Sequence, residues 1–223
     1  NTTQTERGNH MNAFIYTGGE CDYTNISEKP AADDLVIAAD SGWRHAVALR
    51  VKPSVLLGDF DSLDGGNGIP DDVPDDVEIL TVPAEKDFTD TQMAVDEARK
   101  RGAKHITIIG GLGGRLDHTL SCLAILEDLW EKGDRLAVID SGHSRVRFLS
   151  SDSALIPRSG YKYLSLLAVD PVVKGVEIDG VKYPIKGAKL NRTYQFAVSN
   201  EITGNCAFIA VKKGRLLIVE SRD

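Results

Sequence analysis

The sequence predicts two domains of different class: an α/β domain with a mostly parallel sheet over residues 11–143, and an all-β sandwich or barrel over residues 144–223. In the first region, short apolar segments alternate with helical patterns. From about Ser144 onward, short strands follow one another with turn signals roughly every ten residues, and no helical pattern intervenes. The total of 223 residues is enough for one large domain or two modest ones.

The first region contains apolar segments that we expect to form strands, at residues 13–16, 35–39, 54–58, 77–82, 105–110 and 135–140. Helical patterns lie between them at residues 42–50, 89–101 and 116–131. Strands that are apolar throughout and alternate with helices are typical of a parallel sheet covered on both faces. Because ligands bind beyond the carboxyl ends of such strands, we expect the residues that follow them to share one edge of the sheet.

The second region contains segments of strand composition, namely RVRFL, YLSLLAV, VKGVEI, VKYPI, TYQFAVS, AFIAVKK and RLLIVE. Asp179-Gly180 and Lys213-Gly214 have the composition of hairpin turns. A region of about 80 residues is a normal size for a sandwich or barrel.

Composition and charge narrow the functional classes. The formal net charge is −7, from 33 acidic residues against 26 lysines and arginines, which argues against nucleic acid as a partner because such proteins need a basic surface. Three widely spaced cysteines without metal-ligand spacing predict reduced thiols rather than disulfides or structural zinc. The polar start lacks the apolar segment of a secretory signal, and no run approaches the ~20 apolar residues of a membrane span. We therefore expect a cytoplasmic protein with no membrane segment.

Two acidic pairs follow predicted strands. Asp59 and Asp61 come directly after an apolar run, and on an extended chain residues two apart point to the same side. Asp87 and Asp90 lie three apart at a predicted helix start, on neighbouring positions of one face. Either pair alone is most simply a turn or helix cap. Together, at one edge of the same sheet, they favour a site where Mg²⁺ binds carboxylates and phosphate oxygens.

Three weaker candidates accompany these pairs. Gly18-Gly19 follows the first predicted strand. Asp40 follows the second strand, where it either adds to the acidic site or caps the next helix. Lys86, beside the second acidic pair, is either a phosphate ligand or a solvated charge.

The segment GGLGGRLDH, residues 110–118, places four glycines between a strand and a helix. Glycines let backbone N–H groups approach a phosphate closely, and the helix N-terminus also favours an anion. The segment is neither a Walker A loop nor a dinucleotide-binding GxGxxG. Arg115 supplies the guanidinium that phosphate oxygens prefer. Asp117 also fits a helix cap, and His118 taken alone fits an ordinary core or surface histidine.

Five motifs in this order resemble the thiamine pyrophosphokinase family: AADSG at 38–42, GDFDS at 58–62, KDFTDTQ at 86–92, GGLGGRLDH at 110–118, and GVKYPI followed by VSNE between 180 and 201. The resemblance covers nearly the whole chain after residue 10. The family's build, an α/β catalytic domain followed by a β-sandwich, agrees with the change of pattern near residue 144. Two positions depart from the family pattern: Ser41 stands where a glycine is common, and Tyr183 stands where animal and yeast relatives carry a tryptophan.

The resemblance implies Mg²⁺-dependent transfer of the pyrophosphoryl group of ATP to thiamine, giving thiamine diphosphate and AMP. It also implies a homodimer whose sites form where catalytic and β domains of different subunits meet. The expected metal ligands are Asp59, Asp61 and Asp90. The expected catalytic residues are Asp59, Asp61, Asp87, Asp90 and Arg115. Together with the strand-end positions, the motifs assign to nucleotide and phosphate binding Gly18, Gly19, Asp40, Lys86, Thr89, Gln92, Gly110, Gly111, Gly113, Gly114, Arg115, Asp117 and His118. The expected thiamine-binding residues are Tyr183, Ser199 and Asn200.

Other functions fit the same acidic edge. One is a different Mg²⁺-dependent phosphate-transfer enzyme acting on another alcohol, and a second is a phosphatase with Asp59 as nucleophile. A third, from another class, is a catalytically silent sensor of nucleotide or thiamine. Within the favoured reaction, either Asp90 or Asp87 takes the proton from the attacking hydroxyl, or the reaction proceeds without a base.

Overall fold

The computed structural model describes residues 11–60, 68–83 and 88–223. The chain divides into two units. The first contains the residues up to Ile125 together with Ile139–Gly142, and the second contains Leu126–Val138 together with His143–Asp223. Within the described residues, no helix is both long and apolar enough to cross a membrane.

The amino-terminal sheet is built from strands close to those that the sequence predicts. The strands are β1 (Asn12–Tyr16), β2 (Leu35–Ala39), β3 (Val55–Gly58), β4 (Glu78–Thr81), β5 (His105–Ile109) and β6 (Val138–Asp140). Their order is β4-β3-β2-β1-β5-β6, and the neighbours from β4 to β5 pair in parallel. The predicted parallel sheet is therefore confirmed.

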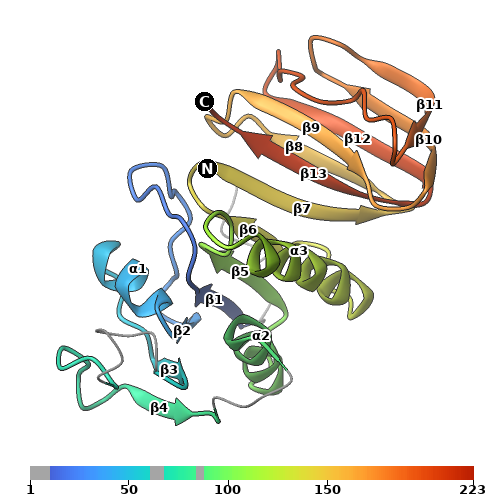
Figure 1. The fold of residues 1–223 in the computed structure, drawn as a ribbon. Coiled ribbons are helices and arrows are strands. Elements are labelled where there is room, and N and C mark those ends of the chain that lie inside the picture. The colour runs from blue at the N-terminus through green and yellow to red at the C-terminus, as the bar shows by residue number, and fades with distance from the viewer. Residues whose placement is uncertain (1–10, 61–67, 84–87) are drawn as a thin grey trace. The chain divides into compact units, whose positions relative to one another are not determined.

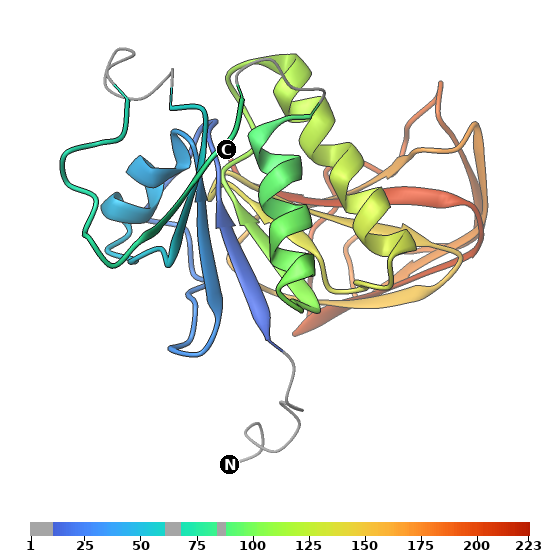
Figure 2. The same ribbon diagram turned by 90° about the horizontal axis from the view of Figure 1, so that it is seen from below.

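Helices follow the predicted pattern as well. They are α1 (Gly42–Ala48), α2 (Asp90–Lys100) and α3 (Leu116–Glu131). In Figures 1 and 2, α1 lies on one face of the parallel sheet and α2 on the other. Apolar side chains fill the α1 side in two buried clusters, which contain Phe14, Tyr16, Ile26, Val36, Ala46 and Ile109 in the first, and Ala38, Trp43, Leu56, Phe60 and Val77 in the second.

One strand differs from the expected buried character. In β4, both Glu78 and Thr81 are exposed, because this strand forms the edge of the sheet next to β3 alone. The apolar composition of the segment 77–82 did not indicate that it would lie at an edge.

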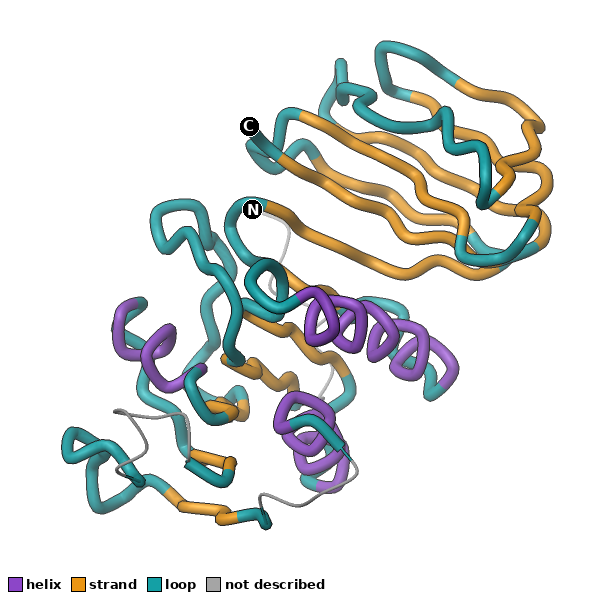
Figure 3. The backbone as a smooth tube through the Cα atoms, viewed as in Figure 1, coloured by secondary structure: helices purple, strands orange, loops and turns teal. Residues whose placement is uncertain are grey.

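The second unit consists mainly of antiparallel strands, which Figure 3 shows as the orange region after the last helix. One layer has the strand order β7-β13-β9, formed by β7 (Ser144–Ser150), β13 (Arg215–Ser221) and β9 (Tyr163–Ala168). The other has the order β11-β10-β12-β8, formed by β11 (Ile185–Asn191), β10 (Val172–Asp179), β12 (Cys206–Lys213) and β8 (Ser153–Pro157). Alternate residues of both sheets are buried, as expected for a sandwich. The predicted all-β architecture is confirmed.

Three details of the second region were predicted wrongly. The predicted strand VKYPI, residues 181–185, does not form: Val181 makes an isolated bridge to Ile202, and β11 begins only at Ile185. Residues 193–199 form no strand, and their apolar side chains Tyr194, Phe196 and Val198 are exposed instead of filling the core. Lys213-Gly214 is not a hairpin turn, because β12 and β13 belong to different sheets; Gly214, at φ 111°, turns the chain from one sheet to the other.

Two strands were missed, and they lie at the two edges of one sheet. β11 carries charged, exposed lysines, so it lacked the apolar alternation that indicates a strand. β8 is short, and only Ile156 in it is fully buried.

Candidate functional site

The loops that follow the parallel strands carry several of the predicted site residues. Gly18-Gly19 follows β1, Asp40 follows β2, Asp59 follows β3, and the loop Gly110–Gly114 follows β5. These strands are neighbours and run in one direction, so their carboxyl ends meet at one edge of the sheet. This edge is called the strand-end site below.

Glycines allow the first and last of these loops to pack together. Gly110 has φ 92°, and a Cβ atom there would lie 2.5 Å from the carbonyl oxygen of Thr17. The N–H of Gly111 donates to the carbonyl of Gly18 over 2.7 Å. A positive φ recurs at Gly113 and Gly114. The glycine loop is therefore held against the end of β1 by its backbone, at positions where a side chain does not fit.

Asp40 lies in a tight approach between two strands. Its φ is 46°, its N–H donates to the carbonyl of Leu57 over 2.7 Å, and a Cβ on Gly58 would lie 3.2 Å from its Cα. Asp40 does not cap α1, because Ser41 occupies the cap position and its side chain makes no capping hydrogen bond. The structure therefore excludes the role of Asp40 as a helix cap, and its role in the acidic site stays a prediction.

The backbone after β3 is not extended, contrary to what was assumed for the acidic pair Asp59 and Asp61. Phe60 has φ 59°, a left-handed conformation, and its ring is 3% exposed within the cluster that includes Trp43 and Leu56. The chain is therefore not extended between Asp59 and Asp61, and the rule that residues two apart point to one side does not apply. Asp61 lies outside the described residues.

The second acidic segment opens α2. Thr89 is the N-cap, because its hydroxyl accepts a hydrogen bond from the N–H of Gln92 over 3.2 Å. Asp90 is the first residue of the helix and does not supply the cap. The side chain of Gln92 donates to Asp96 over 3.1 Å, so it lies along the helix. Lys86 and Asp87 lie outside the described residues.

The start of α3 carries an exposed ion pair. Arg115 donates through Nε and Nη2 to the two carboxylate oxygens of Asp117, over 3.1 and 2.6 Å. This bidentate contact lowers the pKa of Asp117 to about 2. The N–H of His118 also donates to Asp117, over 3.0 Å. Since both charged side chains are well exposed, the pair orients the guanidinium rather than stabilising the fold.

Sequence reasoning missed His45, a residue of α1 that contacts the first glycine loop. Its Nε2 lies 3.1 Å from the carbonyl of Gly19, which can only accept, so Nε2 carries the proton. The hydroxyl of Tyr23 then donates to Nδ1 over 2.9 Å. Burial lowers the pKa of His45, which favours this neutral form. A lone histidine in a short helix belongs to no motif, so only the fold reveals the contact.

The predicted thiamine-binding residues have different surroundings from one another. Tyr183 is 60% exposed, whereas Asn200 is 5% exposed. The amide of Asn200 donates to the carbonyl of Tyr183 over 2.7 Å and accepts from the N–H of Tyr183 and of Glu201 over 3.0 Å each. Ser199 is exposed, with φ 56°, and its N–H donates to Ser165 over 3.0 Å. Asn200 thus fixes the main chain that carries Tyr183.

The strand-end site has the donor chemistry that suits magnesium. Asp40, Asp59 and Asp90 offer carboxylate oxygens, and Mg²⁺ takes one or two such groups together with water and substrate phosphates. Over residues 11–60, 68–83 and 88–223, no three His, Cys, Asp or Glu side chains gather closely enough to hold a metal ion. The carboxylates among these described residues thus form no three-ligand metal site by themselves.

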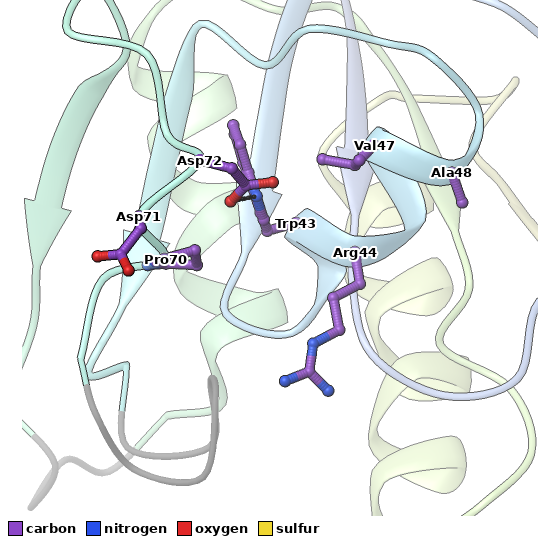
Figure 4. Close-up of a pocket in the computed structure, with 7 residues that line it drawn as sticks. All are labelled: Trp43, Arg44, Val47, Ala48, Pro70, Asp71 and Asp72. Atoms are coloured by element: carbon purple, nitrogen blue, oxygen red, sulfur yellow. Dashed lines mark hydrogen bonds between the residues drawn. The ribbon is translucent and has the colours of Figure 1, made fainter.

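Two pockets lie away from these residues. The first, of about 420 Å³, is bounded by α1 and residues 70–72, where the indole of Trp43 donates to Asp72 over 3.0 Å (Figure 4). The second, of about 640 Å³, lies between β4 and α2. Neither is lined by a predicted site residue, so we assign the candidate site to the strand-end loops.

Comparison with known families decides between the functional classes. The model described as the thiamin pyrophosphokinase catalytic domain matches residues 28–138, and the thiamin pyrophosphokinase vitamin B1 binding domain matches residues 153–216. The chain belongs to the thiamine pyrophosphokinase family. The resemblance carried by the five sequence motifs is thereby confirmed.

Individual relatives agree with this family. A thiamine pyrophosphokinase of Bacillus subtilis is 25% identical over 191 residues, which cover 85% of this chain and 88% of that protein. The crystal structure of thiamin pyrophosphokinase from Geobacillus thermodenitrificans matches with a TM-score of 0.80 and 26% identity, over 96% of this chain and 98% of that one. That of the Bacillus subtilis enzyme has a TM-score of 0.83 at 21% identity, over 95% and 99%. The fold of the whole chain is the fold of this family, whose members are transferases.

Proposed function

We propose that this chain transfers the pyrophosphoryl group of ATP to the hydroxyl of thiamine, giving thiamine diphosphate and AMP. The observation that carries the proposal is the match of a catalytic model and a vitamin B1 binding model, in that order, to two regions that fold as α/β and β-sandwich. The strand-end site supports it, since it combines carboxylates with a glycine loop at a helix start.

The reaction is a substitution at the β-phosphorus of ATP. The hydroxyl oxygen of thiamine forms the new bond, the bond from the β-phosphorus to the oxygen of the α-phosphate breaks, and AMP leaves with that oxygen. Such a transfer needs in-line placement and donors for the phosphate oxygens more than covalent help from the protein. We propose Asp87 or Asp90 as the group that accepts the hydroxyl proton.

In our proposal, different residues of the strand-end site bind the phosphate groups and the metal ion. The guanidinium of Arg115 and backbone N–H groups of the glycine loop bind phosphate oxygens, apart from the N–H groups of Gly110 and Gly111, which donate to the carbonyls of Asp140 and Gly18. Asp117 engages Nε and Nη2 of Arg115, which leaves the Nη1 donors for the nucleotide. Asp59, Asp61 and Asp90 hold Mg²⁺, which neutralises charge on the phosphate oxygens when bound.

Thiamine binding belongs to the second unit in this proposal. The exposed ring of Tyr183 offers an aromatic face to the cationic thiazolium or the pyrimidine of thiamine. Asn200 contributes by holding the main chain of Tyr183 in place. We further propose that the protein acts in the cytoplasm as a homodimer, with each site completed by the β domain of the other copy.

A single assay tests the reaction. Purified protein is incubated with ATP, Mg²⁺ and thiamine, and AMP is separated from ADP. AMP and thiamine diphosphate in equal amounts support the proposal. ADP would indicate an ordinary kinase, a covalent aspartyl phosphate without AMP would indicate a phosphatase, and binding without turnover would indicate a sensor.

The first variant to test is Asp59→Asn. We expect it to abolish turnover while the protein still folds, because removing one of several neighbouring acids relieves repulsion between them. The matched control is Asp33→Asn, an exposed aspartate that precedes β2 at the opposite end of the sheet. Undiminished turnover in Asp59→Asn, or loss of its folded circular dichroism spectrum, would contradict the assigned role.

A further inference from the structure

Two threonines meet in the interior beneath the strand-end site. The hydroxyl oxygens of Thr17 and Thr91 lie 2.6 Å apart, and the residues are 5% and 7% exposed. Thr17 directly follows β1, and Thr91 is the second residue of α2. This hydrogen bond therefore joins the end of a central strand to the first turn of a helix 74 positions later in the chain.

On the strand side, Thr17 supports the glycine loop. Its N–H donates to the carbonyl of Ile109 over 3.0 Å, at the end of β5. A Cβ on Gly110 would lie 2.5 Å from the Thr17 carbonyl, and one on Gly111 would lie 3.4 Å from its methyl group. The backbone of the loop thus rests directly on Thr17.

On the helix side, Thr91 is adjacent to Asp90. The first turn of α2 is also held by the cap of Thr89, but that hydrogen bond lies within the turn and cannot fix where the turn sits on the sheet. Thr91 additionally hydrogen-bonds the thiol of Cys122, a buried residue of α3. The hydroxyl of Thr91 therefore provides a polar contact that ties Asp90's turn to the end of β1.

We propose that the Thr17–Thr91 hydrogen bond sets the distance between the start of α2 and the glycine loop, and that both threonines are positioning residues for the transfer reaction. This inference rests on the proposed function, because it assigns Asp90 and the loop to the same phosphate-bearing substrate. Neither threonine contacts the reacting atoms in this account. Each acts through the group beside it in the chain.

Because the two oxygens lie so close together, side chains of the same shape without hydroxyls cannot take their places at the same distance. Two methyl groups in the same places would need a separation of about 3.5–4.0 Å, so valines would move the helix start roughly 1 Å away from the strand. A misplacement of about 1 Å at a reacting centre can lower a rate by about 10²-fold. Replacing both hydroxyls with groups of the same shape is otherwise nearly neutral for stability.

The experiment compares Thr17→Val/Thr91→Val with Thr17→Ser/Thr91→Ser. For the valine pair we expect kcat to fall by about 10-fold to 10²-fold while KM for thiamine stays unchanged. The serine pair keeps both oxygens and should retain the wild-type rate. Crystal structures of the two variants should show the first turn of α2 displaced by roughly 1 Å from residue 17 in the valine pair only.

The control and the remaining outcomes separate this inference from the proposed function. Ser54→Ala removes a hydroxyl that donates to the Val36 carbonyl over 3.0 Å. This bond lies at the amino-terminal ends of β2 and β3, away from the strand-end site, so the variant should leave kcat unchanged. If the valine pair does not fold, Thr91→Ala against Thr91→Ser gives the same comparison without added bulk. A wild-type rate or an undisplaced helix in the valine pair overturns the inference. If the wild type forms no AMP, the proposed function fails, and the crystal structures still decide the positioning.

Discussion

The glycine loop of the first unit and the segment around Asn200 in the second unit hold their candidate residues by opposite means. The loop 110–114 is shaped by its backbone: its glycines adopt positive φ angles, and the N–H of Gly111 donates to the carbonyl of Gly18 in the neighbouring loop. In the second unit a buried side chain does this work, because the amide of Asn200 makes three hydrogen bonds with main-chain groups.

This difference suits the two ligands that we propose. Phosphate oxygens are bound by backbone N–H groups, which a loop without side chains leaves accessible. An aromatic ligand is bound by an exposed ring, and the ring of Tyr183 needs a rigid main chain beneath it. The first region should therefore be sensitive to added atoms, and the second to removed hydrogen bonds.

The largest effect is expected for Gly110→Ala. The new Cβ would lie 2.5 Å from the Thr17 carbonyl at a residue with φ 92°, so we expect the free energy of unfolding to fall by about 3 kcal/mol or more. Urea unfolding measures this. The matched control is Gly114→Ala, where φ is 66° but no atom lies within 4 Å, and the loss should be only about 1 kcal/mol. Equal losses at both positions would show that the packing against Thr17 does not matter.

A smaller loss, about 2 kcal/mol, is expected for Asn200→Ala, because main-chain groups of Tyr183 and Glu201 lose their partner. KM for thiamine should rise while KM for ATP stays constant, since the released main-chain groups, those of Tyr183 and Glu201, both belong to the second unit. Steady-state kinetics and urea unfolding measure both. As the stability control, Ser199→Ala changes an exposed neighbour and should alter the unfolding free energy by less than about 0.5 kcal/mol. A rise in KM for ATP would be the contrary result.

The smallest effect concerns His45, a side chain that ties a glycine loop of the first unit in the way Asn200 ties Tyr183. Burial lowers its pKa below the ordinary value of 6.5, so the unfolded chain takes up this proton first as pH falls. Its contribution to stability is present above about pH 6.5 and decreases as pH falls from there toward the lowered pKa.

Urea unfolding at pH 7.5 and 5.5 tests this expectation. We expect wild type to lose more stability on acidification than His45→Gln, whose amide can still donate to Gly19 without titrating. Tyr23→Phe, which keeps His45, should retain the pH dependence. The same loss in wild type and His45→Gln would mean that other groups account for it.

Much of the fold could be predicted because its signals are local. The segments 35–39 and 116–131 were placed correctly, since an apolar run between turn residues and a helical repeat ended by glycine each leave a mark on the sequence. The edge position of a strand left no such mark: β4 was predicted as a strand, but its apolar composition did not indicate its exposure, and the charged β11 was missed altogether. Whether a strand has one neighbour or two depends on the rest of the sheet.

For the candidate site, too, only local signals could be predicted from the sequence. Motifs singled out Asp59, Asp90 and the glycine loop, which remain predictions; the parallel sheet brings the ends of β3 and β5, which precede Asp59 and the loop, to one edge. The backbone directly after Asp59 was not predictable, because Phe60 is buried and adopts a left-handed conformation that no spacing rule anticipates. His45 and Thr91 were missed because each acts through a contact with a distant segment.

The sequence by itself determined the fold class, the family and the chemical types of the site residues, because strand and helix periodicity, glycine content and clustered acids are properties of neighbouring residues. Only the tertiary structure decided which side chains hold others in place. The pairing of Thr17 with Thr91 and of Asn200 with Tyr183 joins residues that are far apart in the chain, and such contacts exist only after the core has packed.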